Sequence, residues 1–352
     1  MPRRSIIVCA SLSSFFAAAA AGATPPVPLG SYPVCEASAA LAVPCSDDPG
    51  VTCVWVADNE QSDALFQYRV DEAGRLAPGE PFKIPLEGAH VGDIESLASD
   101  DAGVLVIGSH SRKRGCKADD ARVAVARIER DPLRAALLAG SSGFDDRTKA
   151  CESKWLVLAD DEPEAARALR RDFCASLAAG EQAAKSGDVA SCAGATLDIE
   201  GALSVPDAAG APRLWLGLRA PLLKGLAVLL RAAPSKAGSK RLTFDGIATI
   251  DLRGGGISDL TLSEGWIWGI AGTTDDSNVQ SHLWRVRADR LRVGAIIGGV
   301  ELVAGGELPP GAEGVVIQPE QKRAIVVIDG DTGAQQGRCK VGARQMTIPL
   351  PE

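Results

Sequence analysis

The chain has 352 residues, a formal net charge of -8, 46% hydrophobic residues and 23% charged residues. This composition is that of a globular protein, and the acidic balance excludes a general nucleic-acid binder, which would need a basic stripe. A single large core fits this length, because closed all-β folds often run this long as one domain.

The first residues have the three parts of a secretory signal peptide. Residues 1–4 are positively charged, residues 6–21 are apolar and rich in alanine, and residues 21–23 are small. We therefore predict cleavage after Ala23, followed by a Pro-rich leader at 24–34. A retained membrane anchor is the alternative, but the apolar run is short for a spanning helix. No later segment is apolar enough to span a membrane, so we expect a periplasmic or secreted protein.

Cysteine usage agrees with export. Of the nine cysteines, Cys9 lies in the signal, and eight remain in the mature chain. An even number in an oxidising compartment predicts up to four disulfides, whose pairing the sequence leaves open. The chain has no C-x-x-C pair and only three histidines, so a structural zinc site is not indicated. The eight are Cys35, Cys45, Cys53, Cys116, Cys151, Cys174, Cys192 and Cys339.

Short apolar or alternating segments bounded by turn residues predict strands along most of the chain. Between them, 132–138 and 162–184 are rich in Ala, Leu, Glu and Arg at helical spacing, which predicts a helical insertion near 130–190. The predicted strand regions begin with 35–40, 51–56 and 65–70. A second unit opens at 92–95 and continues through 104–112 and 122–128, and a third resumes at Thr196 and passes 213–219 and 227–230. The next regions are 244–252, 254–260, 266–272 and 281–286, and the last unit opens at 311–314, passes 324–328 and ends in 338–350.

An acid recurs near the start of the predicted inner strands. Glu36, Glu95, Glu200, Asp259 and Glu313 are separated by 59, 105, 59 and 54 residues. A period of about 50 residues built from several short strands is typical of a β-propeller. We predict an all-β, single-domain propeller over 35–352, with five blades by literal count. The 105-residue gap leaves six blades open, and a β-sandwich followed by a second domain is the competing architecture.

Several phrases resemble a bacterial family named domain of unknown function 3616. They run in order from CEASAA and VADNE through GDIESLASD, VLVIGSHSR, LDIEGA, LWLGLRAPL, GGGISDL and IAGTTDD to GAEGVV. The resemblance implies a propeller-like fold, distantly similar to propellers with phytase-like esterase activity. Ser96 departs from the family pattern, because glycine is expected after the acid. Gly256 and Ser258 also depart from it, because they stand where the family tends to have leucine or glycine and arginine. Because the family is uncharacterised, the resemblance implies fold and site position more than a reaction.

Acids at the same point of several blades converge at one end of a propeller's central channel. Carboxylates gathered in this way need protons, arginines or a hard cation, and calcium takes six to eight oxygen ligands. Calcium is therefore the candidate cofactor. The alternative is that arginines Arg112, Arg219 and Arg253 neutralise the acids across blade interfaces. The candidate metal ligands are Glu36, Glu95, Glu200, Asp259 and Glu313.

Other polar residues end strands beside this position. His110 and Arg219 are the candidate catalytic residues, a titratable group and a forked donor for an oxyanion. Arg112, Asp58 and Asp329 are candidate ligand-binding residues. The alternative is that these residues cap turns and that His110 is a surface histidine.

Two functions follow from these patterns. The first is an exported binding or interaction scaffold with an acidic, calcium-binding channel mouth, whose partner is a small anion or a protein. The second is a calcium-dependent phosphoesterase or esterase, which requires Arg219 and His110 to be free of internal ion pairs. No G-x-S-x-G, H-E-x-x-H or phosphate-loop motif is present to favour a particular reaction.

Overall fold

A computed structural model describes most of the chain from residue 22 onward. The described residues are 22–30, 34–87, 89–100, 103–113, 115–130, 133–139, 163–207, 209–232, 244–272, 280–330, 339 and 341–351. Residues 1–21 of the predicted signal, which runs to Ala23, and the middle of the predicted insertion, 140–162, lie outside them.

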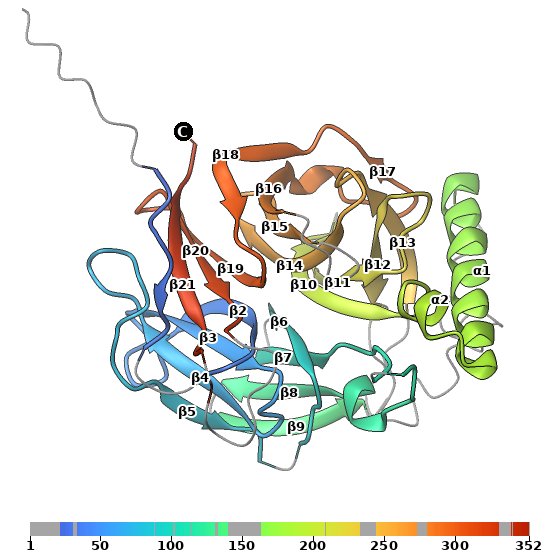
Figure 1. The fold of residues 1–352 in the computed structure, drawn as a ribbon. Coiled ribbons are helices and arrows are strands. Elements are labelled where there is room, and N and C mark those ends of the chain that lie inside the picture. The colour runs from blue at the N-terminus through green and yellow to red at the C-terminus, as the bar shows by residue number, and fades with distance from the viewer. Residues whose placement is uncertain are drawn as a thin grey trace, which may run out of the picture.

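The described strands form five sheets arranged in a ring (Figure 1). Each sheet is a blade of a β-propeller, and its first strand lies nearest the ring axis. Blade 1 contains β2 (Ala37–Pro44), β3 (Thr52–Asp58), β4 (Ala64–Arg69) and β5 (Phe82–Pro85). Blade 2 contains β6 (Ile94–Asp100), β7 (Gly103–Gly108), β8 (Val125–Arg130) and β9 (Leu133–Ala139). The five-blade prediction is thereby confirmed for the described residues.

The other three blades follow in chain order, with two strands supplied from elsewhere in the sequence. Blade 3 contains β10 (Asp198–Pro206), β11 (Pro212–Ala220), β12 (Ala227–Ala232), β13 (Phe244–Ile250) and, parallel to β13, β17 (Ile296–Ile297). Blade 4 contains β14 (Gly256–Ser263), β15 (Trp266–Gly272), β16 (Ser281–Arg287) and β18 (Glu301–Leu308). Blade 5 contains β19 (Ala312–Gln318), β20 (Arg323–Ile328), β21 (Arg344–Pro349) and the N-terminal β1 (Val27–Pro28).

The apolar core is divided into layers between neighbouring blades. Strands with buried residues on both faces, such as β7 and β20, supply side chains to the layers on either side. The innermost strands contact one another around the ring in the order β2, β6, β10, β14, β19 and back to β2. This closed contact order brings the starts of all five inner strands to one axis.

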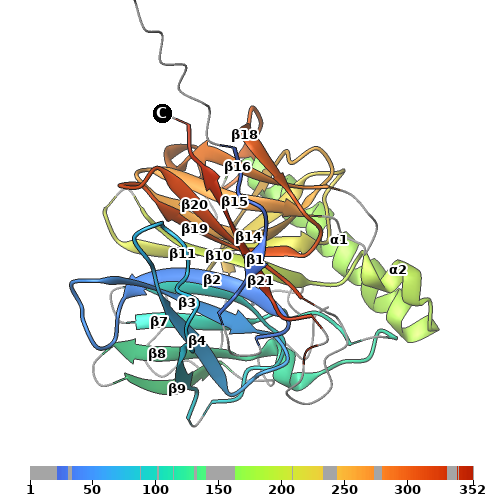
Figure 2. The ribbon, with the colours of Figure 1, turned by 60° about the vertical axis from the view of Figure 1, so that its left-hand side comes forward.

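One helix packs against the outside of blade 3. Helix α1 (Glu164–Ser186) buries Leu169, Phe173 and Leu177 against β13, and it ends at Gly187 in the left-handed conformation. A short helix, α2 (Val189–Ala193), follows it, and both are visible beside the ring in Figures 1 and 2. Among the described residues, short 3-10 helices lie at η1 (Asp120–Val123) and η4 (Ala288–Arg290).

The predicted helix at 132–138 is wrong. This segment is β9, the outermost strand of blade 2, paired antiparallel with β8. Alanine and leucine favour a helix in isolation, but the free edge of β8 offers backbone partners that override a weak local preference.

The two ends of the chain close the ring together. β1 pairs with β21 in blade 5, and the backbone N–H of Thr24 donates to Thr347 O at 2.9 Å. A disulfide joins Cys35, just before β2, to Cys339, just before β21. Blades 1 and 5 are therefore linked by hydrogen bonds and by a covalent bond.

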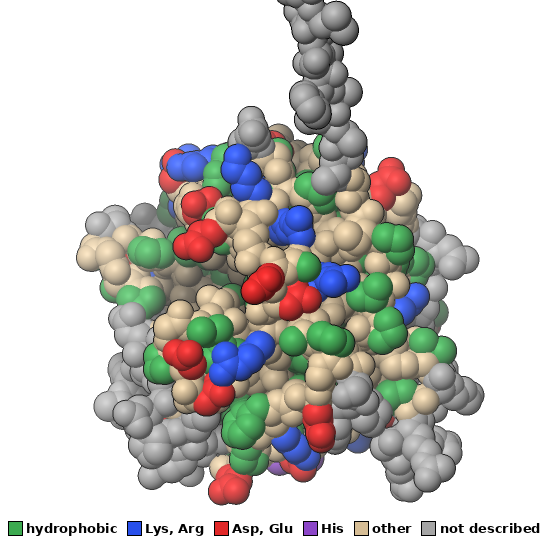
Figure 3. Space-filling model, turned by 90° about the vertical axis from the view of Figure 1, so that its left-hand side faces the viewer, with side chains coloured by type: hydrophobic (Ala, Val, Ile, Leu, Met, Phe, Trp, Pro, Cys, Tyr) green, Lys and Arg blue, Asp and Glu red, His purple; other side chains and the backbone are tan. Residues whose placement is uncertain are grey.

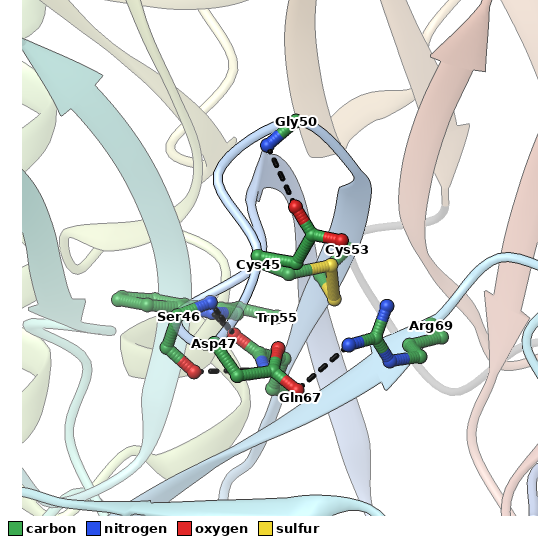
Figure 4. Close-up of a disulfide and its surroundings, with 9 residues drawn as sticks. Cys45, Ser46, Asp47, Gly50, Cys53, Trp55, Gln67 and Arg69 are labelled. Atoms are coloured by element: carbon green, nitrogen blue, oxygen red, sulfur yellow. Dashed lines mark hydrogen bonds and ion pairs between the residues drawn. A yellow bond between two sulfur atoms is a disulfide. The ribbon is translucent and has the colours of Figure 1, made fainter.

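Disulfides also form elsewhere, as predicted. Cys45 and Cys53 join the two strands of the β2–β3 hairpin, beside Gln67, whose Oε1 accepts from Trp55 Nε1 at 3.0 Å (Figure 4). Cys116 pairs with Cys192, and Cys174 is disulfide-bonded as well. This cysteine usage is typical of an oxidising compartment.

Candidate functional site

The inner strand of every blade has a β-bulge close to its start. The register shifts fall between Ala37 and Ala39, Ile94 and Ser96, Ile199 and Gly201, Ile257 and Asp259, and Ala312 and Gly314. A bulge turns the side chain of the extra residue away from the normal alternation of a strand. The residues at the bulges, called the axial residues below, are Ser38, Glu95, Glu200, Ser258 and Glu313.

The axial set corrects the predicted alignment at two blades. Three predicted acids, Glu95, Glu200 and Glu313, are axial residues. In blades 1 and 4 the axial position holds serine instead, because Glu36 lies two residues before its bulge and Asp259 lies one residue after it. A spacing read from the sequence cannot separate positions that differ by one or two residues around a bulge.

Asp259 serves the fold. Its Oδ1 accepts from the backbone N–H of Leu260 at 2.8 Å, and its Oδ2 accepts from Val315 N–H of blade 5 at 2.7 Å. A third backbone hydrogen bond comes from Ala40 of blade 1. Burial raises the pKa of Asp259 well above its usual range, and the N–H donors only partly offset this. The carboxyl group therefore joins three blades.

Arg219, at the end of β11, is the cation at the axis. Its Nη2 lies 3.1 Å from both carboxylate oxygens of Glu313 and forms an ion pair with Glu200. Coulombic interaction with these acids raises the pKa of Arg219, although burial, the largest effect, opposes it. Burial raises the pKa of both glutamates, and Arg219 opposes that rise. Nη2 is therefore held in internal ion pairs, which the scaffold hypothesis expects, and the catalytic role of Arg219 stays a prediction.

Glu95 completes the charged part of the axial set. It is 8% exposed, and its Oε1 accepts a hydrogen bond from Asn59 Nδ2 of blade 1 at 3.3 Å. Burial and the neighbouring charge of Asp93 raise the pKa of Glu95 well above its usual range, while Arg219 lowers it.

Further carboxylates, called the rim carboxylates below, lie at the same end of the ring. Their charges act on one another: burial is the main cause that raises the pKa of Glu36 to about 7, and Glu60, Asp329, Asp58 and Asp93 add to it. Burial likewise raises the pKa of Asp198 to about 6 against the opposing charge of Arg219. The rim carboxylates are Glu36, Glu60, Asp93, Asp198 and Asp329.

A network on blade 2 holds one rim carboxylate. Asp93 accepts from Ser109 Oγ at 2.5 Å and forms a 2.8 Å ion pair with Arg122. Arg122 also donates to Ser111 Oγ at 2.8 Å. The two arginines at this end of the ring, Arg122 and Arg219, are fewer than the carboxylates around them. Acidic groups therefore predominate at the rim.

Three predicted site residues are used inside the protein. His110, which has a φ of 56°, is fully buried, so the surface alternative does not describe it, and its catalytic role stays a prediction. Asp58 is fully buried and accepts from Cys35 N–H and Glu60 N–H. Arg112 pairs with Glu181 of α1 and donates to Cys116 O.

Two other predicted residues can be placed. Asp329 is partly exposed beside Glu36, and its charge contributes to the raised pKa of that group. Arg253 lies in an exposed turn, where its backbone N–H donates to Asp251, so it does not hold two blades together through that contact. Sequence reasoning missed Ser38, Ser258 and Glu60. Only Glu60 had a visible signal, its position two residues after the strand-end Asp58.

The described residues contain no group of three or more His, Cys, Asp or Glu side chains arranged to hold a metal ion. The carboxylates come together, as predicted, but an arginine lies among the axial ones. Within the same residues, no helix is long and apolar enough to cross a membrane. The predicted metal ligands Glu36, Glu95, Glu200, Asp259 and Glu313 therefore stay a prediction, with Asp259 already used by backbone donors.

The raised pKa of Glu36 predicts that the effect of this carboxyl group on stability depends on pH. Glu36 has a folded-state pKa of about 7 against a usual value of 4.5, so its contribution to stability is full below pH 4.5 and is lost as the pH rises through 7. We expect Glu36→Gln to be more stable than the wild type at pH 8, with a smaller difference at pH 5. Urea unfolding in EDTA measures this, with the exposed Glu320→Gln as control; a pH-independent difference would contradict the prediction.

The ring of five sheets, each with a bulge near the start of its inner strand, defines the protein as a five-bladed β-propeller. Residues 52–336 match the family described as Protein of unknown function (DUF3616), and the chain belongs to that family. The resemblance found in the sequence is thereby confirmed. No curated protein matches the chain.

Solved structures give only distant likenesses. U3-55K is 10% identical, with 92% of this chain and 98% of that chain covered and a TM-score of 0.38. A xylan β-1,4-xylosidase from Bacillus halodurans is 10% identical, with 91% and 54% covered and a TM-score of 0.41. PhoX from Pseudomonas fluorescens, in complex with vanadate, is 13% identical, with 91% and 54% covered and a TM-score of 0.26. At these scores the likenesses carry no argument about ligand or reaction.

Proposed function

We propose that this propeller is an exported binding protein whose ligand position is the rim of carboxylates at one end of the ring axis. The observation that carries the proposal is the gathering of these carboxylates, where burial first, and the charges of Glu60 and Asp329 after it, raise the pKa of Glu36 to about 7. Ionising several neighbouring carboxyl groups is unfavourable, so a ligand with positive charge would be stabilised among them. Calcium is the first ligand to test, because it prefers several carboxylate oxygens at once.

Export is part of the proposal. The disulfides support an oxidising compartment, and cleavage after Ala23 would leave Thr24 as the first residue. Thr24 lies at the start of the segment that joins blade 5, where Thr347 N–H donates to its Oγ1 at 2.9 Å. We therefore propose a periplasmic or secreted protein with a single propeller domain over 35–352, to which β1 of the leader adds a strand in blade 5.

The alternative function is a calcium-dependent phosphoesterase or esterase. One observation favours it: within the described part of the chain Arg219 Nη1 has no hydrogen-bond partner, so it can donate to an oxyanion. The burial of His110 and the ion pairs of Arg219 Nη2 favour the binding role instead. A hydrolase would also need a general base that is accessible to substrate.

The test is the thermal midpoint of the chain from Thr24 onward, first in EDTA and then in millimolar calcium. A ligand at about 100 times its Kd adds about 2.7 kcal/mol to the free energy of unfolding, so calcium binding is expected to raise the midpoint clearly. Glu36→Gln should reduce the rise, and the exposed Glu320→Gln should leave it unchanged. An equal midpoint in EDTA and calcium would refute a calcium ligand and direct the search to protein partners.

A further inference from the structure

Arg219 links two blades that are not neighbours in the ring. It belongs to β11 of blade 3, and its Nη2 contacts Glu313 of blade 5, with blade 4 between them in the contact order. The same nitrogen forms the ion pair with Glu200 of its own blade. The guanidinium group therefore lies between two axial carboxylates and crosses the ring axis.

Glu200 depends on this contact. Its side chain is 3% exposed, and within the described residues it makes no hydrogen bond; the Arg219 ion pair is its sole polar contact there. A buried carboxylate with one partner becomes an uncompensated charge when that partner is removed. A positive charge is therefore needed at the position of Nη2 to neutralise the buried Glu200 carboxylate.

Arg219 satisfies that requirement with only part of its guanidinium. Nη2 makes both hydrogen bonds to Glu313 and the ion pair with Glu200, Nε is buried without a hydrogen-bond partner, and Nη1 makes no hydrogen bond within the described residues. An arginine held for its hydrogen-bond geometry would present two nitrogens to one carboxylate. The contact thus supplies mainly charge, which a metal ion can also supply.

We propose that Arg219 determines the ligand charge that the ring axis accepts. Its guanidinium takes the position between Glu200 and Glu313 that a divalent cation would otherwise occupy, and so it confines cations to the rim carboxylates. The axis itself then offers Nη1 as a donor to an acceptor oxygen on a ligand. This inference extends the proposed function but does not require that calcium binds at the rim.

The test counts calcium ions bound by the chain from Thr24 onward, by calorimetric titration after EDTA treatment. Arg219→Met removes the charge and keeps most of the side-chain length, and we expect this variant to bind about one calcium ion more than the wild type. Arg219→Lys keeps a positive charge and should bind no additional ion. In Arg219→Met/Glu200→Gln/Glu313→Gln the two carboxylates are neutral amides, and the additional ion should be lost.

The outcomes separate this inference from the proposed function. If the wild type binds no calcium but Arg219→Met binds it, the rim proposal fails and the inference on Arg219 stands. No gain in a folded Arg219→Met chain, or an equal gain in Arg219→Lys, overturns the inference. Should Arg219→Met fold only when calcium is present, the inference is supported. Failure to fold in either condition, while the triple variant folds, overturns it.

Discussion

Replacing Cys35 and Cys339 by serine is expected to lower the free energy of unfolding by about 5 kcal/mol. The bond closes a loop of 304 residues, and in the chain-entropy view the cost of losing a disulfide grows with the logarithm of that loop. The bond also lies where blade 5 meets blade 1, next to Cys35 O, which accepts from Gly330 N–H at 3.0 Å. Its loss therefore removes a covalent link between blades 1 and 5 and also raises the conformational entropy of the unfolded chain.

The measurement is urea unfolding of the chain from Thr24 onward under oxidising conditions. The matched control is Cys45→Ser/Cys53→Ser in the β2–β3 hairpin, where a sequence separation of 8 predicts a loss of about 2.5 kcal/mol (Figure 4). Similar losses for the two pairs would show that loop length does not set the cost in this fold.

Asp259→Ala is expected to lower the free energy of unfolding by about 3 kcal/mol. The carboxyl group is 1% exposed and holds backbone N–H groups of Leu260, Val315 and Ala40. Removing it leaves buried donors without an acceptor, and each such group costs about 1 to 3 kcal/mol. The loss of the carboxyl group's own desolvation cost offsets part of this sum.

Asp251→Ala is the matched control, because Asp251 also accepts from a backbone N–H, that of Arg253, but at an exposed turn. Urea unfolding should show a small effect there, within about 0.5 kcal/mol of the wild type. A comparable stability for Asp259→Ala and Asp251→Ala would mean that Asp259 does not join the blades. Asp259→Asn should also be destabilised, because its amide would turn a donor toward Val315 N–H.

The exposed surface carries less information than the axis. Figure 3 shows basic and acidic side chains interspersed on the side of the molecule that lies on the left in Figure 1, without a large area of one sign. Carboxylates gather instead where the inner strands begin, and burial together with their charges raises the pKa of Glu36 to about 7. The carboxylates near the ring axis are therefore the stronger candidate for a functional site.

The sequence alone determined the five-bladed ring, the use of disulfides and the end of the ring where carboxylates gather. Strand patterning and a recurring acid are local properties, and they repeat because each blade solves the same packing problem. The segment 132–138 was mispredicted because helix propensity is weak beside the free edge of a neighbouring strand.

The tertiary structure decided which side chains meet. Glu200 and Glu313 are 113 residues apart, and only ring closure places Arg219 between them. A bulge of one residue decided that Ser258 lies at the register shift and that Asp259 holds the next blade, although both stand in the same motif. Tertiary packing likewise buried His110, which the sequence allowed at the surface. These outcomes depend on register, burial and long-range charge, which have no signature in a short stretch of sequence.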